Sequence, residues 1–121
     1  MSNIMIVDDE ALVLLDLTMT VEDLGYGVHS ESTSIASAMG ALEVGPPDLA
    51  LLDIDVAGEP VWPLARALAA DGSEIIFISA NLSHKELQTE FAHFARLEKP
   101  VSRREIEDAM RVALPKSQRV A

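Results

Sequence analysis

The chain has 121 residues, of which 49% are hydrophobic and 24% are charged, so we expect one folded domain with its own core and not a disordered segment. It contains no cysteine, which excludes disulfide frameworks, thiolate nucleophiles and cysteine-bound zinc. Nine basic residues against 20 acidic residues give a formal charge of −11, which disfavours nucleic acid and anionic membranes as partners.

The first half of the chain alternates strand patterns with a helical pattern. Residues 3–7 form a short apolar run, as expected for a strand that is buried on both faces. Residues 11–24 place apolar side chains three and four apart, which predicts a helix that the following glycine ends. Residues 26–30 read as a weaker strand, and residues 34–44 as a helix with a serine at its start. The strongest strand pattern lies at residues 49–54.

The second half continues this alternation. After a loop that contains glycine and proline, residues 60–70 are predicted to form a helix with proline in its first turn. Residues 75–78 are a fourth buried strand, residues 84–94 a helix, and residues 95–98 a short fifth strand. The last helix, residues 102–114, is marked by a serine followed three residues later by a glutamate, which is a capping box.

Strands and helices alternate five times, which predicts an α/β fold with a doubly wound, five-stranded parallel sheet and five helices. One domain is expected to span residues 1–121, with residues 113–121 as a C-terminal tail. The N-terminus lacks the pattern of a signal peptide, and no stretch has the length of a membrane span, so a cytoplasmic location is expected.

Acidic side chains stand at the ends of two predicted strands. Asp8 and Asp9 follow the first strand, and Asp53 ends the third. Ligands of such sheets bind beyond the carboxyl ends of the strands, and clustered carboxylates need a cation to hold them together. Mg²⁺ suits such a site, with Asp9 and Asp53 as ligands, Asp8 acting through water, and the carbonyl of Asp55 as a further donor. The alternative for the first acidic pair is a helix start, where acids favour the positive end of the helix dipole.

A polar residue also ends each of the two later strands. Ser79 follows the fourth strand, and Lys99 follows the fifth. If Asp53 attacks a phosphorus atom, the cation, the lysine ammonium and the serine hydroxyl are positioned to hold the transferring oxygens. Pro100 comes directly after the lysine, and a particular geometry of this peptide bond could aim Lys99 into the site. Taken alone, Lys99 is a surface charge and Ser79 an ordinary strand-end serine.

Four motifs resemble the receiver domain of two-component response regulators over nearly the whole chain: Val7 to Glu10, Leu51 to Asp53, Phe77 to Ala80 and Glu98 to Pro100. The resemblance implies a stand-alone, single-domain receiver with flavodoxin-like strand order 2-1-3-4-5. It implies that Asp53 is the phosphoacceptor, that Asp8 and Asp9 hold Mg²⁺, that Ser79 is the switch hydroxyl and that Lys99 contacts the phosphoryl group. The implied donor is a sensor histidine kinase or a histidine phosphotransfer protein, with an unidentified downstream protein as the reader.

The chain departs from this resemblance at the switch. Receivers usually carry tyrosine or phenylalanine three residues before the lysine, and this chain has Arg96. Three alternatives remain for Arg96: it pairs with an acidic residue, it faces a partner protein, or it is an ordinary exposed charge. Ala80 is either a small residue that leaves access for a donor imidazole or a core residue. The readout face is predicted at residues 84–114, where basic residues suit an acidic partner or a second copy of the chain.

Other functions remain open at this stage. The run from Asp53 to Val56 resembles the nucleophile motif of haloacid dehalogenase phosphatases, although that family places its acid pair after the lysine. Two further alternatives are a phosphate sink, which only drains phosphoryl groups from a kinase, and an interaction module that is never phosphorylated. We expect no enzyme beyond a domain that catalyses its own phosphorylation and dephosphorylation. Three histidines, His29, His84 and His93, are assigned no function, and Trp62 is assigned to packing.

Overall fold

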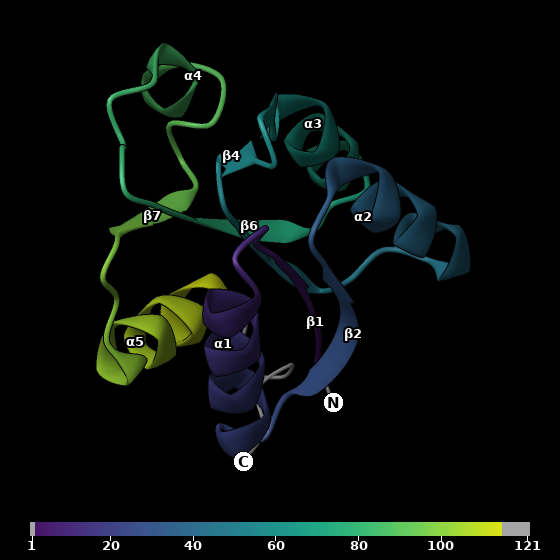
Figure 1. Ribbon diagram of the computed structural model, residues 1–121, viewed down its shortest axis with the longest axis vertical. Helices are drawn as coiled ribbons and strands as arrows, with labels where there is room; N and C mark the ends of the chain where they lie inside the picture. Colours follow the sequence, from purple (N-terminus) through teal and green to yellow (C-terminus); the bar gives the residue numbers. More distant parts are fainter. Residues whose placement is uncertain (1, 115–121) are drawn as a thin grey trace.

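The computed structural model describes residues 2–114 and contains a parallel sheet of five strands in the order β2-β1-β3-β6-β7 (Figure 1). All four neighbouring pairs are parallel. The bounds of these strands are β1 Asn3–Val7, β2 Gly27–Ser32, β3 Leu49–Leu52, β6 Glu74–Ser79 and β7 Ala95–Glu98. Counting only these strands along the chain, the order is 2-1-3-4-5, so the predicted fold class and strand order are confirmed.

Helices cover both faces of the sheet (Figure 1). On one face lie α1 (Ala11–Asp23) and α5 (Arg103–Ala113), whose buried side chains share a core with alternate residues of the strands. On the other lie α2 (Ile35–Ala41), with the short 3₁₀ helix η1 (Leu42–Val44) after it, α3 (Trp62–Ala70) and α4 (Lys85–Gln88). The central strands β1, β3 and β6 are buried on both sides, which explains their unbroken apolar sequences.

Local signals set three of the helix ends. The Ser102 hydroxyl accepts a hydrogen bond from the Glu105 amide, and the Glu105 carboxylate accepts one from the Ser102 amide, so the predicted capping box is present. Ser34 caps α2 by accepting from the amide of Ser37. Gly25, with φ of 92°, follows the last turn of α1, where the left-handed conformation favours glycine.

The strand predicted at residues 49–54 is shorter than expected and ends at Leu52. The chain then forms a small antiparallel hairpin of β4 (Asp55–Val56) and β5 (Glu59–Pro60). Its turn residues, Ala57 and Gly58, have φ of 54° and 83°. Two successive positive φ values suit the twist of a two-residue hairpin, although the alanine carries a side chain in a conformation that glycine adopts more readily.

The prediction of a helix at residues 84–94 is wrong for most of that length, because α4 has only one turn. In a continued helix the carbonyl of Leu87 would accept from the amide of Phe91. That amide instead donates to the carbonyl of Glu86, and the Leu87 carbonyl accepts from the side chain of Arg96. The helical ladder therefore stops after Gln88.

The ends of the described region also bear on the predictions. Ala113 still belongs to α5, so the predicted tail begins later than residue 113. Residues 115–121 of that tail lie outside the described residues. Within residues 2–114, no helix has both the length and the apolar character that crossing a membrane requires.

Candidate functional site

A cleft at the carboxyl edge of the sheet gathers the polar residues that follow four of the strands. Parallel strands place their carboxyl ends at one edge, so residues far apart in sequence meet there. Asp53 follows β3, Ser79 ends β6 and Lys99 follows β7. The cleft has a volume of about 390 Å³ and is lined by Asp9, Glu10, Asp53, Asp55, Ser79, Ala80, Asn81, His84 and Lys99.

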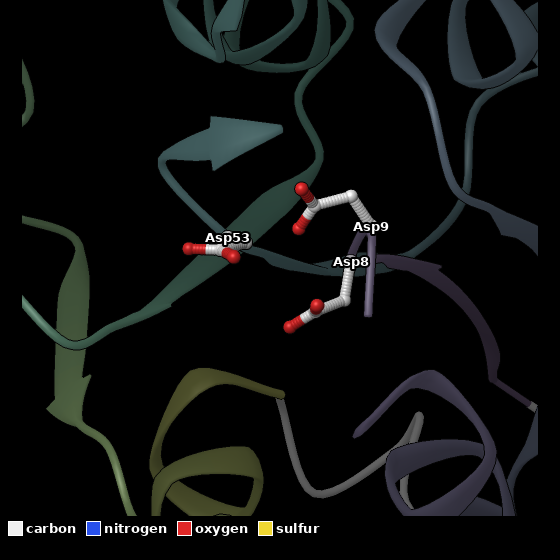
Figure 2. A group of neighbouring side chains, drawn as sticks. All are labelled: Asp8, Asp9 and Asp53. Carbon is white, nitrogen blue, oxygen red and sulfur yellow. The ribbon is translucent and has the colours of Figure 1, made fainter. Parts of the chain in front are cut away.

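Three carboxylates come together in this region (Figure 2). Asp8, Asp9 and Asp53 each offer an oxygen, and these oxygens lie within 4.8 Å of one another. Asp8 is 1% exposed and Asp53 8% exposed, whereas Asp9 is open to solvent. A divalent cation with a preference for oxygen ligands would offset the repulsion among these groups, so the three side chains fit Mg²⁺.

The ammonium group of Lys99 lies among these carboxylates. Its Nζ donates to Asp8 Oδ2 at 2.9 Å and to Asp53 Oδ2 at 3.2 Å, and it lies 3.7 Å from Glu10 Oε1. The peptide bond between Lys99 and Pro100 is cis. The lysine is therefore an integral part of the acid cluster and not a surface charge.

Burial and neighbouring charges together shift the pKa values of Asp53 and Lys99. Burial raises the pKa of Asp53, and the opposing effects of Lys99 and of the Ile54 amide are too small to cancel it. For Lys99, burial lowers the pKa, but hydrogen bonds and charge attraction from Asp8 and Asp53 outweigh burial and raise it. Lys99 is consequently charged at neutral pH, and any further cation in the cleft would favour the ionised form of Asp53.

Backbone amides orient the carboxylates. The Ile54 amide donates to Asp53 Oδ1 at 2.7 Å, and the Glu10 amide donates to Asp8 Oδ1 at 2.9 Å. The amide of Ala57, in the turn of the β4-β5 hairpin, donates to Asp9 Oδ2 at 2.9 Å. The unexpected hairpin thus ties the loop after Asp53 to an acid that follows β1.

The loop after β6 forms another wall of the cleft. Ser79 is buried, and its Oγ accepts from the Asn81 amide at 3.3 Å. The Asn81 Oδ1 accepts from the amide of Ser83 at 3.0 Å and from its hydroxyl at 2.6 Å. Ala80 is exposed, so the core alternative considered for it does not hold, and its small side chain leaves this wall open.

Sequence reasoning missed two residues that line the cleft, Glu10 and His84. The imidazole of His84 also lies edge-to-face with the Trp62 ring, with ring centroids 5.6 Å apart. Trp62 itself is 8% exposed and packs against Phe77 and Phe91, as its assignment to packing predicts. The predicted position of His84 at the start of the helix that follows a predicted strand, near the edge where ligands bind, was the available signal.

Arg96 does not reach the cleft. Its guanidinium donates to the carbonyls of Leu87, Phe91, Ala92 and Phe94. Within residues 2–114 no acid forms an ion pair with it, so the predicted pairing with an acid is not found. The side chain is half-buried, which also excludes a plain exposed charge.

Comparisons with known proteins agree with this geometry. The family model described as the response regulator receiver domain matches residues 4–111. The receiver domain of a modulated diguanylate cyclase from Desulfovibrio desulfuricans G20 has 28% identity and a TM-score of 0.81, with 93% of each chain covered. A response regulator receiver protein from Sinorhizobium medicae WSM419 gives the same identity, TM-score and coverage.

A more distant structure shows the fold alone. The CheY-like receiver domain protein from Methanospirillum hungatei JF-1 has 22% identity and a TM-score of 0.82, covering 93% of this chain and 92% of that chain. A search of curated protein sequences finds no match. Because the family model spans most of the sequence and the acidic cleft lies where such domains bind Mg²⁺, this chain belongs to the receiver domain family of two-component response regulators.

Proposed function

We propose that the domain accepts a phosphoryl group on Asp53 from a histidine of a sensor kinase or phosphotransfer protein, and that it signals by protein contact. The observation that carries this proposal is the position of Lys99, whose Nζ bonds Asp8 and Asp53 together. A lysine held between two buried acids is poised for a transferring group that brings its own negative oxygens.

In the proposed transfer an oxygen of Asp53 forms a bond to phosphorus while the bond from phosphorus to the donor imidazole nitrogen breaks. The electron pair of the broken bond stays on that nitrogen. Lys99 shifts from the carboxylates toward a phosphoryl oxygen, and the Ser79 hydroxyl, whose oxygen accepts from the Asn81 amide, donates its own proton to another phosphoryl oxygen. Asp9, Asp53 and the carbonyl of Asp55 would hold Mg²⁺, with Asp8 acting through water, and the ion would neutralise charge at the acceptor.

The donor is proposed to dock on α1, next to the cleft. Leu12, Leu15 and Met19 project from one face of this helix and are 81%, 53% and 52% exposed. A groove of about 460 Å³ begins at this face, and Glu10 and Lys99 line both the groove and the acceptor cleft. A donor helix seated on the apolar face would therefore carry its histidine to the mouth of the cleft.

Output is proposed to run through the face of residues 84–114. This segment contains as many acidic as basic residues, and Arg111 is paired with Glu107 and Asp108. These charges do not favour the acidic partner that the sequence suggested. The remaining partners for this face are a second copy of the chain and another signalling protein. A phosphate sink, which needs no reader, is the alternative.

The test is incubation of the chain with a small acyl phosphate and Mg²⁺, followed by intact mass measurement. We expect one added phosphoryl group on the wild type and on Asp71→Asn, which alters an exposed acid at the end of α3, and none on Asp53→Ala. Circular dichroism checks that each variant is folded. Labelling of Asp53→Ala at the wild-type rate would show that the acceptor is wrong. Repeated turnover of a simple phosphate ester would favour the haloacid dehalogenase alternative instead.

A further inference from the structure

Arg96 lies on β7, beside Phe77 of β6, and its side chain reaches back over the segment between α4 and β7. Its Nη1 lies 2.5 Å from the carbonyl oxygen of Leu87. Its Nη2 lies 3.3, 2.9 and 3.2 Å from the carbonyl oxygens of Phe91, Ala92 and Phe94. One guanidinium therefore holds four carbonyls of residues 87–94, which we call the clamped segment.

The segment is not helical after Gln88, so its carbonyls lack the bonds of a continued helix. The Phe91 carbonyl accepts from the Phe94 amide at 3.1 Å as well as from Arg96. Carbonyls at the end of a helix have no partner within the helix, and those of irregular turns lack a ladder. The planar guanidinium carries several N–H donors in a fixed arrangement, so it serves several carbonyls at once. An aromatic ring in this position would leave them without these bonds.

The clamped segment carries part of the core. Leu87 and Phe91 are buried, and the ring of Phe91 stacks on Trp62 at 5.7 Å and meets the edge of Phe77 at 5.5 Å. Movement of the segment would pull Phe91 out of this cluster. Arg96 and Phe91 therefore fix the same backbone from two sides.

The loop at residues 80–84 is held differently. Among the described residues its hydrogen bonds are local: they join Asn81 to Ser79 and Ser83, and the His84 carbonyl to the Leu87 amide. It lines the acceptor cleft directly, through Ala80, Asn81 and His84. An anion in the cleft would accept the hydroxyl proton of Ser79, whose oxygen accepts from the Asn81 amide, whereas none of the four bonds of Arg96 involves a group of the cleft.

We propose that Arg96 is a static clamp that keeps residues 87–94 in one conformation whether or not Asp53 carries a phosphoryl group. The response to phosphorylation is then confined to the loop at residues 80–84, and the surface of the clamped segment is preformed for its partner. The clamp itself stands on the geometry alone. The confinement of the response rests on the function proposed above.

The first test uses the unliganded chain. Hydrogen exchange of the Phe91 and Phe94 amides is compared in Arg96→Met and in Arg66→Met. The second variant removes another arginine that binds this segment, through an exposed ion pair with Glu90. We expect exchange in Arg96→Met to exceed that in Arg66→Met by about tenfold. A ratio of threefold or less would overturn the clamp.

A second variant keeps this test decisive if Arg96→Met does not fold. Arg96→Lys retains the charge but offers one ammonium in place of the planar guanidinium. Exchange at the same two amides is expected to exceed that of Arg66→Met by more than threefold in this variant as well. Equal exchange in Arg96→Lys and Arg66→Met would show that the segment does not require a guanidinium.

The second test adds beryllofluoride and Mg²⁺, which mimic the aspartyl phosphate, to the wild type. Amide resonances of residues 80–84 should shift, while exchange at Phe91 and Phe94 should change by threefold or less. A larger change at Phe91 and Phe94 would show that the clamp is not static. Absence of any shift near Asp53 and in residues 80–84 would contradict the phosphoacceptor function and the confined response, while the unliganded comparison still decides the clamp.

Discussion

Two cationic side chains at the same strand, Arg96 and Lys99, lie three residues apart and bind opposite kinds of partner. Lys99 is held by the carboxylates of Asp8 and Asp53, and Arg96 by four main-chain carbonyls. The partners of Lys99 would be redistributed by a metal ion or a phosphoryl group. The partners of Arg96 are fixed parts of the backbone, so their positions do not depend on the charge in the cleft.

The contacts of the acceptor cleft depend on which ligand is bound there, whereas those of the clamped segment do not. In the cleft, like charges are close, buried and balanced by one lysine, so a ligand with its own charges shifts the balance. At the clamped segment a single cation donates to four neutral carbonyls, and of these the Phe91 carbonyl also accepts from the Phe94 amide. The positive charge of Lys99 therefore takes part in ligand binding, and that of Arg96 stabilises the backbone.

The largest effect is expected for Lys99→Met. Loss of the ammonium should slow phosphorylation by a small donor about 100-fold, as for removal of one charged or hydrogen-bonding group from a transition state. The same change should tighten Mg²⁺ binding roughly tenfold, because a positive charge that competes for Asp8 and Asp53 is gone. Labelling kinetics and isothermal titration measure the two effects.

Lys85→Met is the matched control, since Lys85 is exposed on α4 and lies outside the cleft. Both quantities should stay at their wild-type values in this variant. If Lys99→Met weakened Mg²⁺ binding and slowed labelling together, Lys99 would be a structural support of the acid cluster and not a separate participant.

A smaller effect, on stability alone, is expected for Arg96→Met. Leaving these partly buried carbonyls without the Arg96 donor should lower the free energy of unfolding by about 2–4 kcal/mol, measured by urea denaturation without metal. The ion pair of Arg66 with Glu90 is exposed, so Arg66→Met should change the unfolding free energy much less. Equal losses in the two variants would remove the contrast between a clamp and a surface pair.

The smallest effect is expected for Asp53→Asn in metal-free buffer, and its sign is informative. Because burial raises the pKa of Asp53 above its ordinary value of 3.8, the folded state binds a proton more readily than the unfolded state. Wild-type stability therefore falls as pH rises from 3.8 through the raised folded pKa. Asp53→Asn lacks this loss and should melt at a higher temperature at pH 7.

The stabilisation by Asp53→Asn should vanish at a pH below 3.8, where the carboxyl group is protonated in both states. Asp71→Asn, at an exposed site, serves as the control for the loss of one formal charge. A lower melting temperature for Asp53→Asn at pH 7 would mean that the bonds from Lys99 outweigh burial at this carboxylate.

Local sequence signals predicted the cleft because they depend on strand ends alone. A parallel sheet puts every carboxyl end at one edge, so Asp8, Asp53, Ser79 and Lys99 were placed together without knowledge of their contacts. The start of α5 was equally local, since Ser102 and Glu105 complete the capping box by themselves.

The failures have a non-local cause. Residues Leu87, Phe91 and Phe94 have the four- and three-residue spacing of a helix face, yet the carbonyl of Leu87 is taken by Arg96, which arrives from β7. The turn of the β4-β5 hairpin is stabilised by Asp9, which lies far away in sequence, and its first residue is alanine and not the asparagine or glycine that would have marked it.

The most direct test of the phosphoacceptor claim is to locate the phosphoryl group on the chain. After reaction with a small acyl phosphate and Mg²⁺, treatment with borohydride reduces an aspartyl phosphate to homoserine, and peptide mass spectrometry identifies the altered residue. The structure predicts conversion of Asp53, with Asp8, Asp9 and Asp55 unchanged. Conversion of one of those three in place of Asp53, or of no residue, would contradict the proposed function.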